Sequence, residues 1–154
     1  MGITQLEIRT NLQIRKTPAE VFEAIVDPIK MCNYFISKSN GRLESGKTLI
    51  WKFPEFDFEF SVNVVHIENN KSIIYTWKDL DAEYETTVTI SMMLREGNST
   101  LVTITEGPRE NNLAGLKWLQ GNTEGWANFL ACLKAYLEFG INLRKGGFDF
   151  LKAN

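Results

Sequence analysis

The sequence predicts an α+β domain in which a strand and two short helices precede about six antiparallel strands and a long final helix. Apolar residues recur every second position over residues 6–15 and again over most of residues 39–106. Over residues 122–143 they recur every third or fourth position, which is the period of an α-helix. The 154 residues suit one domain, 1–154, with a core at about 6–143 and a tail at 144–154 that the pattern leaves unplaced.

The first strand is predicted over Leu6–Arg15, where apolar and polar side chains alternate. Thr17-Pro18-Ala19-Glu20 then has the composition of a capping box with a proline at the first helical position. Asp27-Pro28 repeats the combination of cap and proline, so we expect one short helix to stop and a second to begin. Met31, Tyr34 and Phe35 are its expected buried residues.

The strands that follow are separated by turn signals at Ser45-Gly46, Glu68–Lys71 and Gly97-Asn98, and by a loop at Asp79–Ala82. Gly107-Pro108 is expected to end the sheet. The predicted strands are Gly41–Glu44, Lys47–Phe53, Phe56–Ile67, Ser72–Lys78, Glu83–Leu94 and Thr100–Glu106.

The long helix is predicted over Asn122–Leu143, with a short helix leading into it and Gly146-Gly147 closing it. Its apolar stripe is the broadest in the chain, so the rest of the chain is expected to cover it. The stripe consists of Trp126, Phe129, Leu130, Leu133, Leu137 and Ile141.

Composition and charge exclude several classes of protein. Seventeen basic and 19 acidic side chains give a net charge of −2, without the concentrated basic patch of a nucleic-acid binder. No apolar run reaches the length of a membrane span, and the N-terminus lacks the features of a signal peptide. Cys32 and Cys132 lie among apolar residues and are expected to be free, buried thiols. We therefore expect a cytoplasmic protein.

No motif for catalysis, metal binding or a cofactor is evident. His66 is the only histidine and lies in a predicted strand without acidic or cysteine neighbours at the spacing of metal ligands. The carboxylate pairs Asp57/Glu59 and Glu83/Glu85 fall on predicted solvent faces. We expect no catalytic residues, no metal and no cofactor.

The aromatic residues indicate a cavity, because a curved sheet around a long helix is difficult to fill completely. A filled aromatic core is the alternative interpretation. Tyr34, Tyr75, Tyr84, Thr86 and Thr103 could supply polar groups to the cavity. The predicted lining residues are Tyr34, Trp51, Tyr75, Trp77, Val88, Met92, Trp126 and Leu130.

Several stretches together resemble the activator-of-Hsp90-ATPase-like family of the START/Bet v 1-like superfamily. They are LQIRKTPAEVFEAIVDP, LESGKTLIW, SIIYTWKD, NSTLVTIT and TEGWANFLACLKAYLEFG. The resemblance implies a helix-grip fold, in which a sheet of about seven strands grips the C-terminal helix around an apolar cavity. It also implies binding of lipids or other hydrophobic molecules, and in some members cyclase or hydrolase activity.

Three functions stay open at this stage. The leading hypothesis is non-enzymatic binding of a small hydrophobic or lipid-like ligand. The second is a chaperone-associated or stress-response protein-interaction domain, which a large exposed apolar patch would favour. The third is a polyketide cyclase-like or hydrolase-like enzyme, with His66, Tyr75 or Glu106 as candidate polar residues. An inward-facing His66 beside a carboxylate would favour the enzyme. The oligomeric state is not predicted.

Overall fold

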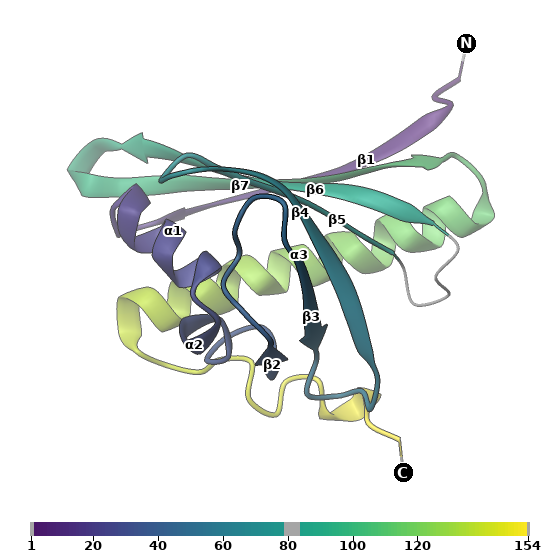
Figure 1. Ribbon diagram of the computed structural model, residues 1–154. Helices are drawn as coiled ribbons and strands as arrows, with labels where there is room; N and C mark the ends of the chain where they lie inside the picture. Colours follow the sequence, from purple (N-terminus) through teal and green to yellow (C-terminus); the bar gives the residue numbers. More distant parts are fainter. Residues whose placement is uncertain (1, 79–83, 154) are drawn as a thin grey trace.

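A computed structural model describes residues 2–78 and 84–153, and the predicted loop at Asp79–Ala82 lies outside them. One antiparallel seven-stranded sheet, in the order β1-β7-β6-β5-β4-β3-β2, curves around a long C-terminal helix (Figure 1). The chain runs through β1 (Gln5–Ile14), α1 (Pro18–Val26), α2 (Pro28–Met31), β2 (Lys38–Ser39), β3 (Thr48–Lys52), β4 (Glu59–Glu68), β5 (Ser72–Lys78), β6 (Glu85–Arg95), β7 (Ser99–Glu110) and α3 (Leu113–Phe139). The predicted α+β fold with a sheet gripping the last helix is confirmed.

Local signals fix the two short helices as predicted. The Thr17 hydroxyl accepts a hydrogen bond from the backbone N–H of Glu20, and the Glu20 carboxylate accepts one from the backbone N–H of Thr17. Asp27 ends α1 and caps α2 by accepting from the backbone N–H of Ile29. The predicted burial of Met31, Tyr34 and Phe35 is confirmed.

Two strand predictions were wrong in the middle of the chain. Residues 41–44 form no strand, and β2 is the short pair Lys38–Ser39 instead. The strand predicted from Phe56 begins only at Glu59. Phe56 and Phe58 stack on each other with ring centroids 5.3 Å apart, so their alternation with acidic residues reflects a local aromatic contact rather than a strand.

The last strand continues past Gly107-Pro108, which corrects the prediction that the sheet ends there. β6 pairs with β7 only as far as Gly107, whereas β1 pairs with β7 through Glu110. Pro108 therefore lies where β7 has one partner strand instead of two. A proline, which has no N–H to donate, is tolerated in such an edge position.

The C-terminal helix is longer at its start and shorter at its end than predicted. α3 is one continuous helix of 27 residues, about 40 Å long, and no separate helix precedes Asn122. It ends at Gly140, whose left-handed backbone (φ 65°) is the usual helix terminator. Ile141 and Leu143 consequently lie outside the helix and are exposed.

Two features dock α3 against the sheet. The predicted face is buried, with Trp126, Phe129, Leu130 and Leu133 at most 3% exposed. Near the start of the helix, a Cβ atom at Gly115 would overlap the carbonyl oxygen of Glu110, so only glycine allows this close approach to the end of β7.

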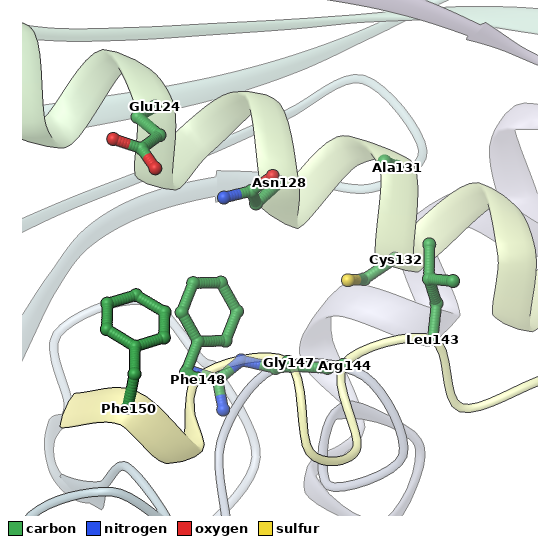
Figure 2. A pocket seen from close by; sticks show the side chains of 9 residues that line it. All are labelled: Glu124, Asn128, Ala131, Cys132, Leu143, Arg144, Gly147, Phe148 and Phe150. Carbon is green, nitrogen blue, oxygen red and sulfur yellow. The ribbon is translucent and has the colours of Figure 1, made fainter. Parts of the chain in front are cut away.

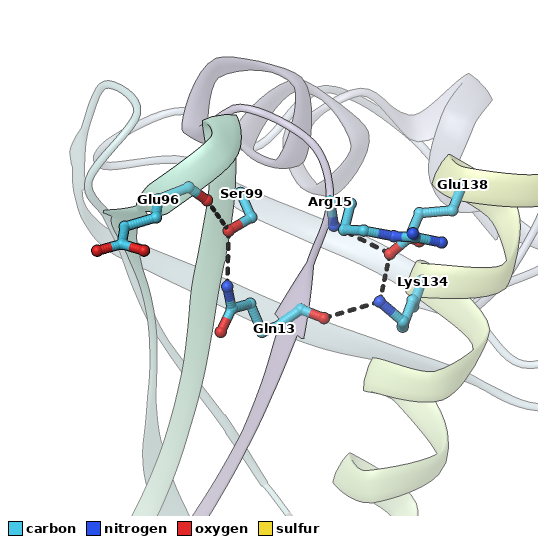
Figure 3. Close-up of polar contacts among 6 residues, drawn as sticks. All are labelled: Gln13, Arg15, Glu96, Ser99, Lys134 and Glu138. Carbon is cyan, nitrogen blue, oxygen red and sulfur yellow. Dashed lines mark hydrogen bonds and ion pairs between the residues drawn. The ribbon is translucent and has the colours of Figure 1, made fainter.

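A polar clamp holds the other end of α3 against β1 (Figure 3). The Glu138 carboxylate accepts from the Arg15 backbone N–H (2.9 Å) and Nε (2.8 Å), and also from Lys134 Nζ. Lys134 donates in addition to the carbonyl oxygen of Gln13 at 2.9 Å. Burial would raise the pKa of Glu138, but the hydrogen bonds from Lys134 and Arg15 outweigh it and lower the pKa from 4.5 to about 2.

Two glycines of α3 offer a matched test of the docking. Gly115→Ala should lower the free energy of unfolding by roughly 1–3 kcal/mol, because its methyl group meets the Glu110 carbonyl. Gly121→Ala, in the same helix with open space around it, should raise stability by up to about 1 kcal/mol. Urea unfolding of both variants checks this, and equal effects would contradict the proposed close approach.

The clamp predicts a pH dependence. The pKa of Glu138 is lowered in the folded state, so the Glu138 carboxylate contributes fully to stability above about pH 4.5. This contribution is lost as the pH falls toward about 2. Glu138→Gln should therefore destabilise the protein at pH 7, and the difference from wild type should shrink between these pH values. Urea unfolding at a series of pH values measures it. Glu96→Gln, at an exposed carboxylate, should change the free energy of unfolding at pH 7 by no more than about 0.5 kcal/mol.

Candidate functional site

The site is built on three inward-facing positions in register across the sheet. Tyr75 of β5 is opposite Val88 of β6, and Val88 is opposite Glu106 of β7. Because side chains alternate between the two faces of a strand, all three point to the same side as the inward residues Val102 and Ile104. A carboxylate therefore occupies a position that the alternation of β7 reserves for core residues.

The Glu106 carboxylate is buried and accepts four hydrogen bonds. Oε1 accepts from Trp126 Nε1 at 2.8 Å and from Asn122 Nδ2 at 3.1 Å. Oε2 accepts from Thr86 Oγ1 at 2.5 Å and from Trp77 Nε1 at 2.9 Å. Burial of a carboxylate is costly unless its oxygens find donors, and these donors come from β5, β6 and α3. The lone pairs of both oxygens are thus engaged.

Glu106 positions two indole rings that form one wall of the site. Trp77 and Trp126 stack with ring centroids 5.5 Å apart and an interplanar angle of 27°. Trp51 meets Tyr75 edge to face at 5.6 Å, and Tyr75 meets Trp77 in the same way at 5.4 Å. Such pairs stabilise beyond their buried area. The result is a continuous aromatic wall from β3 to α3.

Two buried polar atoms in this wall, Trp51 Nε1 and Tyr75 Oη, have no hydrogen-bond partner among the residues that the structure describes. An unpartnered buried polar group costs about 1–3 kcal/mol. Burial, together with the nearby charge of Glu106, raises the pKa of Tyr75 well above its usual value, so its hydroxyl stays protonated. It can therefore donate a hydrogen bond to a guest molecule or accept one from it.

The eight predicted lining residues do not all meet at this wall. Trp51, Tyr75, Trp77 and Trp126 do, and Val88 lies between Tyr75 and Glu106 in the sheet. Tyr34 reaches the same core through Phe129, at a ring distance of 5.5 Å, and Leu130 is buried on the sheet-facing side of α3.

Met92 lies elsewhere. It is buried at the far end of β6, where its N–H donates to the carbonyl oxygen of Lys71 in the β4–β5 turn. There it borders a surface hollow of about 580 Å³ with Pro18 and Leu94.

Several other polar residues that the sequence suggested for the cavity or for catalysis do not contribute polar groups to the aromatic wall. The Tyr34 hydroxyl donates to the carbonyl oxygen of Ala24, and Thr103 donates to Asn11 on the other face of the sheet. Tyr84 is 41% exposed beneath the guanidinium of Arg109, 4.0 Å from its ring centroid. His66 is exposed on β4, next to a β-bulge. Asn122 was not predicted, because nothing near it in sequence marks its partner Glu106.

The two cysteines are free, but their environments differ from the prediction. Cys132 is buried in α3, as expected, whereas Cys32 is exposed. Cys32 is the C-cap residue that directly follows α2, a helix of one turn that buries only Met31, so the adjacent position faces outward. Within residues 2–78 and 84–153, no group of acidic, histidine and cysteine side chains could hold a metal ion. No helix in these ranges could cross a membrane.

A second hollow, of about 210 Å³, lies on the side of α3 that faces the C-terminal tail (Figure 2). Glu124, Asn128 and Cys132 approach it from α3, and Phe148 and Phe150 approach it from the tail. None of the predicted lining residues borders it.

A curved antiparallel sheet that grips a long C-terminal helix is the arrangement of a helix-grip protein. The family model "Activator of Hsp90 ATPase homolog 1-like protein" matches residues 15–138, so the chain belongs to this family. This confirms the resemblance noted in the sequence. A comparison with curated proteins gave no match.

Solved structures of similar proteins share the fold. A Staphylococcus saprophyticus protein is 37% identical, with a TM-score of 0.78 over 90% of this chain and 96% of its own. The Aha1 dimer from Colwellia psychrerythraea is 20% identical, with a TM-score of 0.74 over 88% and 98% of the two chains. DynU16, from the dynemicin biosynthetic locus, is 21% identical with a TM-score of 0.78 over 88% of this chain and 48% of its own.

Replacing Glu106 tests its role as the common acceptor. In Glu106→Gln the new amide group must face one of the two indole N–H groups, which cannot become acceptors. We expect a loss of roughly 2–3 kcal/mol in the free energy of unfolding, with a shift in tryptophan emission. Glu7→Gln, at an exposed carboxylate of β1, should change stability by no more than about 0.5 kcal/mol. Equal stability of the two variants would show that the four hydrogen bonds contribute nothing.

Proposed function

We propose that this protein binds a small hydrophobic or lipid-like ligand between the sheet and α3. The observation that carries the proposal is the pair of buried, unpartnered polar atoms in an otherwise aromatic wall, Trp51 Nε1 and Tyr75 Oη. A ligand with an apolar body and one polar oxygen would match both the aromatic surface and the unpartnered polar atoms of this wall. It would cover aromatic surface and supply the missing hydrogen bond.

Access is the second part of the proposal. Three half-buried aromatic residues, Phe53, Phe60 and Trp77, connect the buried wall with the surface. Phe53 and Phe60 stack at 5.1 Å, and Phe60 meets Trp77 at 6.0 Å. Because these rings pack against one another, a ligand enters by separating them. The three rings are only half-buried, so they lose less buried surface than the other rings of the wall when they turn outward.

The same geometry favours binding over the cyclase or hydrolase alternative. A general acid or base must be within hydrogen-bond reach of the proton that it transfers. Both oxygens of Glu106 already accept two hydrogen bonds from the protein, and His66 faces outward. In this proposal Glu106 therefore orients the two indoles and does not react.

A protein-interaction role is the second candidate, and one observation favours it. Phe139, Ile141 and Leu143 are 60%, 53% and 53% exposed at the C-terminal end of α3. Exposed apolar groups that lie together are typical of protein contacts. The similar Colwellia protein is described as a dimer, and a contact between copies of this chain at these residues would be the corresponding arrangement.

Two tyrosines allow the ligand proposal to be tested with matched variants. N-phenyl-1-naphthylamine serves as the fluorescent probe, with displacement by 1-naphthol and by naphthalene. Wild type should bind the probe with a dissociation constant on the order of micromolar, and naphthol should displace it about tenfold better than naphthalene, because one hydrogen bond to the ligand is worth about 1 kcal/mol or more.

Tyr75→Phe should remove that preference without lowering stability, since its hydroxyl has no partner among the described residues. Tyr34→Phe is the control, because it loses the bond to Ala24 and should cost about 1 kcal/mol of stability while keeping the preference for naphthol. No saturable binding by wild type would overturn the proposal and favour the interaction role. A preference that survives in Tyr75→Phe would show that Tyr75 Oη is not the group that binds the polar oxygen of the ligand.

A further inference from the structure

The C-terminal tail, residues 141–151, is attached to the loop between β3 and β4 by a largely buried ion pair. Arg144 Nη2 donates to Glu55 Oε2 at 3.1 Å and Nη1 donates to Oε1, although the two residues lie 89 positions apart. Their side chains are only 15% and 5% exposed. The Arg144 guanidinium also lies over the rings of Phe148 (4.7 Å) and Phe53 (5.5 Å). The tail thus runs back beneath α3 in a fixed position (Figure 1).

This attachment creates the hollow of about 210 Å³ between α3 and the tail. The two sides of the hollow differ in chemistry (Figure 2). Glu124 and Asn128 project from α3, one helical turn apart, and neither has a hydrogen-bond or ion-pair partner in residues 2–78 and 84–153. The rings of Phe148 and Phe150 rise toward them from the tail. The hollow therefore presents an anion and an amide on one side and aromatic faces on the other.

The charges of the lining residues determine whether the hollow favours a cation or an anion. Arg144 also borders the hollow, but Glu55 neutralises it through two hydrogen bonds. The Glu124 carboxylate is left as the unbalanced charge among the lining residues. Aromatic faces attract cations as well, which adds to the effect of the carboxylate. An anion would meet a carboxylate and two ring faces, all of which repel it.

We propose that this hollow binds a small organic ammonium ion, with the ammonium group against Glu124 and Asn128 and the apolar body against the rings of Phe148 and Phe150. A dry cavity of about 150 Å³ can accommodate benzene, so a hollow of about 210 Å³ accommodates a single aromatic ring with a short aminoalkyl group. The site is separate from the aromatic wall between the sheet and α3. It also uses residues beyond position 138, where the match to the family model ends.

Benzylamine and its uncharged analogue benzyl alcohol test the proposal directly. Each is titrated into the ¹⁵N-labelled full chain at about 150 mM salt, and backbone and side-chain amide shifts are followed. Benzylamine, a cation at neutral pH, should bind saturably with a dissociation constant on the order of millimolar, as expected of so small a ligand. The largest shifts should occur at Gly147, Phe148 and the Asn128 side chain. Benzyl alcohol should bind at least tenfold more weakly.

Three variants distinguish specific binding in the hollow from nonspecific electrostatic attraction to an acidic protein. Glu124→Gln should weaken benzylamine binding to the level of benzyl alcohol, whereas Glu96→Gln, at an exposed carboxylate elsewhere, should leave it unchanged. Ala131→Phe should fill the hollow and abolish binding of both compounds.

Equal affinity for benzylamine and benzyl alcohol would overturn the proposal, and so would undiminished binding of benzylamine to Glu124→Gln. Amide shifts that are spread over the whole surface, and that decrease equally in Glu124→Gln and Glu96→Gln, would overturn it as well. Shifts centred on Trp51 and Tyr75 would also overturn it, because they would place the ligand in the sheet–helix interior.

Discussion

The buried Glu106 carboxylate is the contact on which the arrangement of the interior depends. It accepts hydrogen bonds from β5, β6 and α3, so one side chain of β7 ties three other elements together. A buried carboxylate is tolerated only when its oxygens are satisfied. If α3 slid or rotated, donors and acceptors would therefore be left unpaired. The same hydrogen bonds fix the orientation of the stacked indoles of Trp77 and Trp126.

Two further attachments hold α3 along its length. Near its start, Gly115 lets the helix approach the end of β7 at a distance that no side chain allows. Near its end, the charged clamp of Glu138, Lys134 and Arg15 joins it to β1. A helix held at its start, middle and end presents a rigid surface on both sides. Rigid supports favour binding, because less conformational freedom is lost when a ligand is ordered on them.

The two binding proposals concern opposite sides of α3. The sheet-facing side of α3 packs against the aromatic wall, and the unpartnered atoms of Trp51 on β3 and Tyr75 on β5 are the basis of the proposed apolar ligand with one polar oxygen. The face toward the tail combines a carboxylate with ring faces and suits a small cation. The first belongs to the part of the chain that matches the family model, and the second requires the tail beyond it. Of the two proposed sites, the first therefore rests on the family fold and the second on the attached tail.

Local patterns determined much of this fold from the sequence alone, because a capping box, a turn or an alternating strand is read from neighbouring residues. The capping residues Thr17 and Glu20, the strand Ser72–Lys78 and the buried face around Leu133 all agree with the structure. The aromatic residues of the site were predicted in the same way, since inward positions follow from alternation in the strands and from the helical period in α3.

Only the tertiary structure decided the contacts between distant segments. Asn122 became part of the site through Glu106, α3 could start at Leu113 because Gly115 fits against Glu110, and the tail took its place through Glu55 and Arg144. Each depends on how the curved sheet brings remote residues together, and no period of two or 3.6 residues carries that information.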